Sequence, residues 1–515
     1  MEFIPTYDEL WVISDIHMGG EKTPERDFQI FCRGERLGNF ICHLITLRQN
    51  DELALVLNGD VIDSLAEDIV PGYAALDVDT INALMKHIYE DPAFEPVWDA
   101  LRQFVRSKKR NLVFVIGNHD IELALTPVEA SIRQKLAEGD AKVNSRIHFS
   151  NHGGGFACRV GGKRVFCTHG NEVDAWNIVD YNALGNLDNA IRAGRRVDPG
   201  GWVPNSGTRM VIDLMNKIKA SYPFVDLLKP EVKPVLSVAL TLKPALLREV
   251  NIISSLKIIK DRVVGALEVR NLLSAGGDID SVPSDQVVAD ALPALLGQSL
   301  LDQIRSEHQL GQSEDELLIA AEVDMVAGKP AIENLGALEG ATLGVGDLVS
   351  GLLGRTDKVE ALRRALSDWL GNDTTFDLTA EDDTYKAIVP RAGPGVDFIV
   401  TGHTHLARAI KQDGRQYFNC GTWIRLLRFT TQSLESRESF TKVYNELEKG
   451  TMDALDQAEI PGPDGKPVKL VLDRTNAVRI SRAKNGTAVK GELLRITGGE
   501  NGTPINPVPE KGIDK

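Results

Sequence analysis

Side chains that can bind metal ions follow several short apolar segments of this 515-residue sequence. The first segment, LWVIS, is followed by Asp15 and His17 in the tripeptide Asp-Ile-His. Alternate residues at the end of a strand point the same way, so this carboxylate and imidazole can reach one metal ion. The same tripeptide can also begin a capped helix, and alone it decides little.

Two further apolar segments end in a glycine that precedes polar residues. Gly59 precedes Asp60 after LALVLN, and residues 117–120 read Gly-Asn-His-Asp after NLVFVI. A glycine lets the backbone approach closely whatever the next side chain binds. Gly-Asp is also a common turn, whereas four such residues in succession at the end of a buried strand are hard to explain as a turn.

Histidines complete the pattern. His169 stands in His-Gly after RVFCT, and His403 and His405 stand in Gly-His-Thr-His after VDFIVT. Any one of them would more often be a structural histidine, but five of the ten histidines lie at these segment ends. Polar groups that are costly to desolvate commonly converge at strand ends because they form a ligand site. The set therefore predicts a metal site.

The ordered motifs Asp-x-His, Gly-Asp, Gly-Asn-His-Asp, His-Gly and Gly-His-Thr-His resemble those of the calcineurin-like metallophosphoesterase superfamily, over roughly residues 10–175 and 396–425. This resemblance implies an α/β fold, a four-layer α/β/β/α sandwich interrupted here by a large helical insert. It also implies a dinuclear metal centre between the loops of two sheets. By position, the ligands would be Asp15, His17, Asp60 and His405 for the first metal ion and Asp60, Asn118, His169 and His403 for the second.

The resemblance also implies the chemistry. Oxygen and imidazole donors without thiolate suit manganese, iron, zinc, nickel or cobalt, and we expect two divalent ions, manganese first. Two cations roughly 3.5 to 4 Å apart lower the pKa of a bridging water, whose hydroxide attacks the phosphoryl group in line. His119 would stabilise the transition state or protonate the leaving oxygen. Asp120 would either orient the ring of His119 or cap a helix.

The segments between the motifs predict how the chain is organised. Alternating apolar and helical stretches predict residues 1–176 as the first part of a layered α/β catalytic domain, and strand-like sequence at 396–430 closes it. Residues 177–395, with apolar positions at spacings of three and four, predict a mainly helical insert that is a substrate-selecting cap or an interaction domain. Residues 431–515 are predicted as a C-terminal extension with a disordered tail from about residue 497.

Charge and composition indicate which partners and which cellular location to expect. The formal charge of −15 argues against a surface built to hold nucleic acid, which stays a possible but not a favoured partner. No apolar run is long enough for a membrane span, and the first residues do not resemble an export signal, so a cytoplasmic protein is expected. Five cysteines without paired spacing indicate reduced thiols.

The substrate is expected to be a phosphomonoester or a phosphodiester. Residues 60–65 lack the arginine that follows the second aspartate in the protein Ser/Thr phosphatases of the superfamily, which disfavours that subfamily. A loose similarity to UDP-2,3-diacylglucosamine pyrophosphohydrolases at residues 169–177 keeps a nucleotide-sugar lipid as an alternative. Repair nucleases share three motifs, so DNA ends or single strands are another alternative. A non-catalytic binding module is least expected, because every ligand position is filled.

Overall fold

The computed structural model describes residues 4–23, 28–70, 72–174, 176–197, 202–219, 221–228, 238, 241–242, 302, 306, 357–370, 376–449, 451–484 and 486–511. Most of the predicted helical insert therefore lies outside the described residues. The chain divides into two compact units. The first contains Met1–Ile212, Thr374–Leu426 and Leu472–Asp514, and the second contains Asp213–Asp373, Leu427–Val471 and Lys515.

A seven-stranded sheet in the first unit has the strand order β17-β16-β15-β2-β3-β4-β5. Its strands are β2 (Glu9–Ile13), β3 (Leu53–Asn58), β4 (Arg110–Val115), β5 (Ile147–Ser150), β15 (Asn476–Arg482), β16 (Val489–Thr497) and β17 (Asn506–Pro509). Strands β2 to β5 are parallel, and β15 pairs antiparallel with β2. Every residue of β2 and of β3 is buried, as expected for parallel strands with both faces covered.

A six-stranded sheet in the same unit has the order β1-β6-β7-β8-β10-β9. Its strands are β1 (Thr6–Tyr7), β6 (Phe156–Val160), β7 (Lys163–Cys167), β8 (Phe398–Thr401), β9 (Arg408–Gln412) and β10 (Arg415–Asn419). The strand β8 is parallel to both β7 and β10. This pairing joins segments that are more than two hundred residues apart in the sequence.

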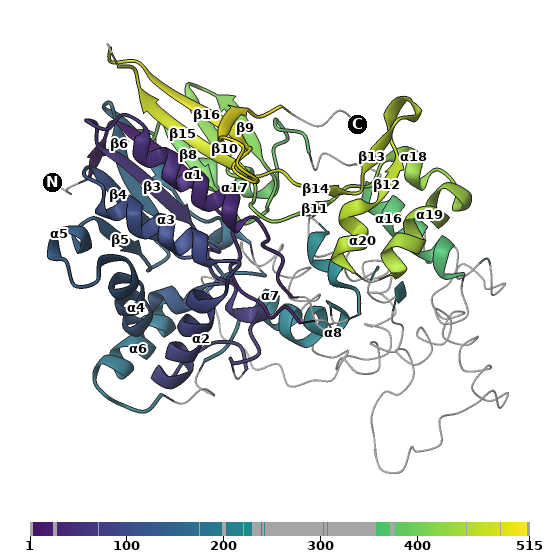
Figure 1. The fold of residues 1–515 in the computed structure, drawn as a ribbon, viewed down its shortest axis with the longest axis horizontal. Coiled ribbons are helices and arrows are strands. Elements are labelled where there is room, and N and C mark those ends of the chain that lie inside the picture. Colours follow the sequence, from purple (N-terminus) through teal and green to yellow (C-terminus); the bar gives the residue numbers. More distant parts are fainter. Residues whose placement is uncertain are drawn as a thin grey trace. The chain divides into compact units, whose positions relative to one another are not determined.

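The two sheets share one apolar core. Val12, Val56 and Val113 of the first sheet belong to the same buried cluster as Val165 and Val400 of the second sheet. The helices α1 (Gly34–Thr46) and α3 (Glu95–Arg106) cover the outer face of the seven-stranded sheet (Figure 1). The helix α17 (Asp383–Arg391) packs on the six-stranded sheet through a second apolar cluster. The predicted α/β sandwich is therefore confirmed.

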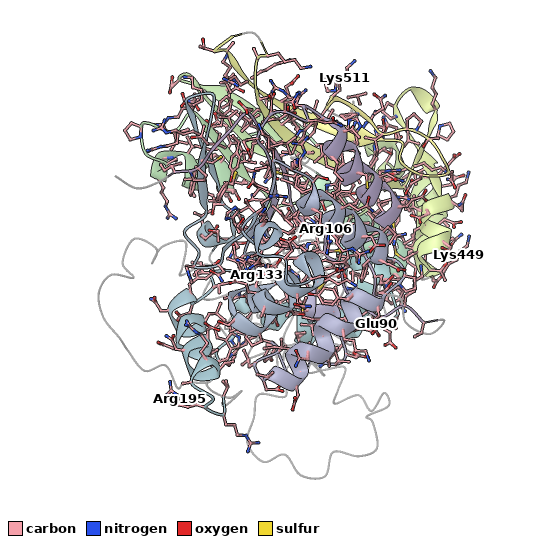
Figure 2. The ribbon with its side chains drawn as sticks, turned by 60° about the vertical axis from the view of Figure 1, so that its left-hand side comes forward. Glu90, Arg106, Arg133, Arg195, Lys449 and Lys511 are labelled. Atoms are coloured by element: carbon pink, nitrogen blue, oxygen red, sulfur yellow. The ribbon has the colours of Figure 1, made fainter. Side chains whose placement is uncertain are left out.

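The first unit contains further helices among the described residues. They are η1 (Ser64–Ala66), α2 (Val78–Glu90), η2 (Ile121–Ala124), α4 (Thr126–Ala137), α5 (Ala141–Asn144), η3 (Asn171–Val173), α6 (Tyr181–Arg192) and α7 (Ser206–Met210). Arg106 of α3 pairs with Glu138, and Arg133 pairs with Glu129 along α4 (Figure 2). These ion pairs give both helices a polar outer surface.

The described part of the second unit is mainly helical. It contains the π-helical turn η5 (Val211–Met215), which begins at the unit boundary, α8 (Asn216–Lys219), η6 (Pro223–Leu227), α16 (Lys358–Leu370), α18 (Thr431–Leu434), α19 (Arg437–Glu448), α20 (Met452–Gln457), β12 (Glu459–Pro461), η7 (Pro463–Gly465) and β13 (Pro467–Lys469). The pair β11 (Leu426–Leu427) and β14 (Val471–Leu472) lies where the chain passes between units. No helix among the described residues is long and apolar enough to cross a membrane.

The C-terminal segment differs from its prediction. Instead of a separate extension, β15 and β16 continue the central sheet beside β2. The tail expected to be disordered from about residue 497 contains β17, which pairs with β16. Its composition suggested disorder, but β17 is an edge strand, where its prolines are tolerated. The helices α6 and α17, placed in the insert by sequence, also belong to the first unit.

Candidate metal centre

Parallel strands bring the predicted ligands to the same edge of the sandwich. Asp15, Asp60 and Asn118 follow β2, β3 and β4, whose carboxyl ends lie side by side. His169 and His403 follow β7 and β8, which are parallel in the second sheet. All the predicted ligands therefore lie on loops at strand ends, as the sequence suggested.

The backbone of these loops is in an unusual conformation. Five of the predicted ligands have positive φ angles of 52° to 68°, namely Asp15, His17, Asp60, His403 and His405. Left-handed backbone is uncommon for residues other than glycine, and each case costs of order 1–3 kcal/mol. Hydrogen bonds between the loops hold this conformation, including His17 N to Asp60 O at 2.9 Å. Such strain is typical of residues whose side chains are held at a ligand site.

The first group of donors is buried and converges closely. Nε2 of His17 lies 3.3 Å from Nε2 of His405 and 3.8 Å from Oδ2 of Asp60. Nε2 of His405 lies 3.3 Å from Oδ1 of Asp15. One donor atom from each of these four residues lies within 4.8 Å of the others. The group can therefore surround a single cation.

The second group shares Asp60 with the first. Asp60, His169 and His403 each offer a donor atom within 4.8 Å of the others. Nε2 of His169 lies 3.0 Å from Oδ2 of Asp60, yet both atoms are buried without a hydrogen-bond partner. His169 donates its Nδ1 proton to the carbonyl of Asn58 at 2.8 Å, which leaves Nε2 as a lone-pair donor. These atoms fit a cation between them.

Asn118 adds a carboxamide to this region. Its Nδ2 donates to Oδ1 of Asn177 at 3.4 Å, and its Oδ1 is buried without a hydrogen-bond partner. A buried carbonyl oxygen without a partner is costly unless it meets a donor or a cation. The donor set of Asp, His and Asn without thiolate is that of a borderline or hard divalent metal ion.

Electrostatics also favour positive charge here. Burial raises the pKa of Asp15, and His169 only partly opposes this effect. Burial would raise the pKa of Asp60 too, but His169 and His119 outweigh it and lower the pKa. Burial would lower the pKa of His169, but the Asp60 carboxylate raises it to about 10. The cluster therefore attracts positive charge despite its burial.

Two glycines leave the space that this packing needs. A Cβ atom on Gly117 would lie 2.1 Å from Oδ1 of Asp60. A Cβ atom on Gly59, whose φ is 86°, would lie 2.3 Å from Nδ1 of His169. Any side chain at either position would displace a predicted ligand.

His119 and Asp120 have different partners from those expected. Nδ1 of His119 lies 3.1 Å from Oδ1 of Asp63, so Asp63 orients the ring. Asp120 instead accepts hydrogen bonds from Gly117 N and Val61 N, both at 2.7 Å, and makes no capping bond to η2. The interpretation of Asp120 as a helix-capping residue is therefore wrong, whereas its role in orienting the ring of His119 stays a prediction. Asp120 ties the loop after β3 to the loop after β4.

Two acidic residues to which the sequence analysis gave no role, Asp63 and Asp174, bond to histidines of the candidate site. Asp63 is buried, and its pKa is well below the usual range because His119 and His17 outweigh the effect of burial. Asp174 accepts a hydrogen bond from Nε2 of His403 at 3.0 Å. Burial would raise the pKa of Asp174, but this bond and the charge of His403 lower it to about 2. Asp63 follows Asp60 by three residues, so its position could have predicted a role at the site. Nothing in the sequence around Asp174 indicated such a role.

Comparison with known proteins places this geometry in context. Residues 9–214 match the family model described as calcineurin-like phosphoesterase. The match contains the candidate ligands up to His169 but ends before the Gly-His-Thr-His segment, which β8 brings back to the site. No curated protein matches the chain significantly.

Proposed function

We propose that the chain, whose residues 9–214 match the calcineurin-like phosphoesterase family model, hydrolyses phosphoesters through two divalent cations that share Asp60. One observation carries this proposal. The Asp60 carboxylate belongs to two donor groups at once, one with Asp15, His17 and His405 and one with His169 and His403. A bridging carboxylate is the simplest use of that position.

The structure suggests which atoms would bind each cation. Nε2 of His17, Nε2 of His405 and Oδ1 of Asp15 would bind the first, because Nε2 of His405 lies 3.3 Å from each of the other two atoms. Nε2 of His169 and Oδ1 of Asn118 would bind the second, because both are buried without a hydrogen-bond partner.

The remaining ligand, His403, would use Nδ1, since its Nε2 already bonds to Asp174. Asp174 and the carbonyl of Asn58 would then serve the second site in the same way, because each fixes the orientation of a ligand ring. Manganese is our first proposal for both ions, and the donor set also suits iron, zinc, nickel or cobalt.

Bound cations would activate a water molecule and neutralise charge on the phosphoryl group. His119 would supply the proton that the leaving oxygen needs. Its Nδ1 is bonded to Asp63, so Nε2 is the atom that would donate this proton. The Asp63 carboxylate, whose pKa is held far below the usual range, stays ionised and would stabilise the protonated ring. Asp63 is therefore a positioning residue in this scheme.

The test is metal analysis of the purified protein together with hydrolysis of p-nitrophenyl phosphate and its bis ester. We expect about two metal ions per chain and turnover that depends on them. The Asp60→Asn variant should lose both, whereas Asp99→Asn, which removes a half-exposed carboxylate on α3, should lose neither. One bound ion per chain, or full turnover by Asp60→Asn, would contradict the two-cation proposal.

The relative rates on the two esters also address the substrate. We propose a phosphomonoester or a phosphodiester, and the monoester-to-diester ratio decides between them. A nucleotide-sugar lipid and single-stranded DNA belong in the same assay as the alternatives.

We further propose that the insert predicted at residues 177–395 is a cap that selects the substrate. The first unit contains both α6 and α17, so a deletion that tests the cap should spare them and remove residues between 213 and 373.

A further inference from the structure

The side chain of Asn177 connects two candidate ligands of the second cation. Its Oδ1 accepts a hydrogen bond from Nδ2 of Asn118 at 3.4 Å, and its Nδ2 donates to Oδ2 of Asp174 at 2.8 Å. The same Oδ2 accepts the bond from Nε2 of His403 at 3.0 Å. One carboxamide therefore links Asn118, which follows β4, to His403, which follows β8.

The direction of these bonds determines which atom each ligand presents. Because Nδ2 of Asn118 is the donor to Asn177, Oδ1 of Asn118 is left buried without a hydrogen-bond partner. Because Nε2 of His403 bonds to Asp174, Nδ1 is the ring atom that remains for a cation. Asn177 must accept on one side and donate on the other, and a carboxamide supplies both groups.

The orientation of Asp174 depends on Asn177. Oδ1 of Asp174 accepts a hydrogen bond from Trp176 N at 3.0 Å, and its Oδ2 accepts the bonds from Asn177 and His403. Without the amide of Asn177, Oδ2 would lose one of these two bonds. The carboxylate would then turn more freely about its Oδ1 anchor, and the ring of His403 would turn with it.

Asn177 is itself fixed from two directions. It is only 8% exposed, and its main-chain carbonyl accepts a hydrogen bond from Nδ2 of Asn171 at 3.0 Å. On the other side, a Cβ atom on Gly207 of α7 would lie 2.0 Å from Oδ1 of Asn177. Gly207 N also donates to the carbonyl of Trp176 at 2.8 Å. The backbone of α7 therefore packs directly on the carboxamide, which leaves no room for a side chain at residue 207.

The helix α7 lies within residues 177–395, the segment predicted as an insert, and it belongs to the first unit. Its beginning is fixed by Asn205, whose side chain accepts a hydrogen bond from Thr208 N at 2.8 Å. The part of the chain that leads out of the first unit therefore contacts a residue that bridges two candidate ligands.

We propose that Asn177 is a positioning residue that orients Asn118 and His403 together, and that α7 keeps it in place through Gly207. This proposal deepens the two-cation function and rests on it for the effect on metal binding. The hydrogen bonds themselves need no metal ion, so their loss can be measured in the metal-free protein.

The first test is proton NMR of the full-length, metal-free protein. The Nε2 proton of His403 should give a hydrogen-bonded imidazole signal that exchanges slowly with water, and its loss in His403→Gln assigns it. Asn177→Leu keeps a side chain of similar size but removes both hydrogen bonds, so this proton should exchange roughly tenfold faster. An unchanged exchange rate would overturn the proposal, whatever the number of metal ions that the chain binds.

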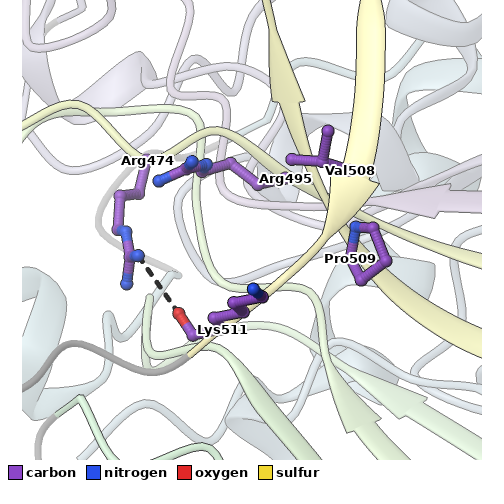
Figure 3. Close-up of a pocket in the computed structure, with 5 residues that line it drawn as sticks. All are labelled: Arg474, Arg495, Val508, Pro509 and Lys511. Atoms are coloured by element: carbon purple, nitrogen blue, oxygen red, sulfur yellow. Dashed lines mark hydrogen bonds between the residues drawn. The ribbon is translucent and has the colours of Figure 1, made fainter.

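Asn506→Leu is the matched control, because it makes the same substitution at an exposed position of the edge strand β17. Two residues of this strand line the pocket in Figure 3, which contains no candidate ligand and is lined by Arg474, Arg495, Val508, Pro509 and Lys511. The control should leave the His403 signal unchanged. Equally faster exchange in Asn506→Leu and Asn177→Leu would count against a specific role for Asn177.

Calorimetric titration with Mn²⁺ then connects these bonds to the metal centre. The two-cation proposal predicts two sites in the wild type, and Asn177→Leu should weaken one of them about 10- to 100-fold while the other is unchanged. Two sites of unchanged affinity would overturn the positioning role and leave the two-cation proposal intact. A single site in the wild type would contradict the two-cation proposal, and the exchange rate of the His403 proton would then decide the positioning role.

Gly207→Ala tests the part played by α7 without changing any residue of the ligand loops. Its Cβ would meet the amide oxygen of Asn177, so the variant should show the same two effects as Asn177→Leu. Combined with Asn177→Ala, it should add no loss beyond that of Asn177→Ala alone, because no amide remains to be displaced. Additive losses, or a Gly207→Ala variant that behaves like the wild type, would overturn the proposal that α7 acts through Asn177.

Discussion

Replacement of Asp63 by asparagine should reveal how His119 works. Asp63 is buried, its Oδ1 lies 3.1 Å from Nδ1 of His119, and its Oδ2 lies 3.5 Å from Nδ1 of His17. Asparagine keeps the shape but removes the negative charge that stabilises a protonated His119. A hydrogen bond to a charged group contributes about 1.5–3 kcal/mol, and each 1.4 kcal/mol corresponds to about a tenfold change in rate. We therefore expect kcat to fall by roughly 10- to 100-fold.

The assay should vary the leaving group. Phenyl phosphate releases a more basic oxygen than p-nitrophenyl phosphate does, so it depends more on a proton from His119. Asp63→Asn should therefore slow the phenyl ester more strongly. Metal content must be measured in parallel, because Asp63 also contacts His17. Equal loss on both esters with full metal content would refute proton donation through this pair.

A double-mutant cycle sharpens the test. If Asp63 acts only through His119, the variant Asp63→Asn combined with His119→Gln should be no slower than His119→Gln alone. His119→Gln by itself should lose about 10²- to 10⁴-fold in kcat, the usual contribution of a general acid. Additive losses would show that Asp63 has a separate role, and its contact with His17 would be the first place to look.

Four further predictions follow from the structure. Asp120→Asn should lower the free energy of unfolding by about 1–3 kcal/mol, measured by chemical denaturation, because one of its two bonds to the backbone is lost; an unchanged midpoint would contradict that role. Gly117→Ala should weaken metal binding about 10- to 100-fold, since its Cβ would meet Asp60; metal analysis decides, and full occupancy would show that the loop adapts. A chain that stops at residue 470 should be insoluble or unfolded by circular dichroism, because β15 and β16 are missing from the central sheet; a folded product would show that the sheet is stable without them. Chelation should lower the melting temperature, since a ligand at 100 times its Kd stabilises by about 2.7 kcal/mol; calorimetry with and without chelator would detect the shift.

The sequence predicted the parts of this site whose signal is local. A buried strand followed by a metal-type side chain is visible in the sequence, so Asp60, Asn118 and His169 could be predicted as candidate ligands from short motifs. Their convergence required only that the carboxyl ends of parallel strands meet at one edge. The α/β sandwich was predictable for the same reason, because its strands are continuous apolar segments.

The parts that sequence analysis missed depend on contacts between distant residues. Asp174 reaches His403 across 229 positions, and nothing in the spacing of Asp174 indicated this partner. The bonds of Asp120 to the backbone of Gly117 and Val61, and the bond of His119 to Asp63, had no signal in the sequence either. The choice between neighbouring carboxylates is set by loop geometry, which adjacency in the sequence does not reveal.

The C-terminal strands show why the full chain is needed for the site. The carbonyl of Asp15 accepts hydrogen bonds from Thr422 Oγ1 at 2.9 Å and from Trp423 N at 3.1 Å. The indole of Trp423 in turn donates to the carbonyl of Asn476, the first residue of β15, at 3.0 Å. The strained backbone of Asp15 is therefore supported by residues more than four hundred positions later. Since strain of this kind persists only where surrounding contacts fix it, the strands that were expected to be an appendage instead help to hold a candidate ligand in place.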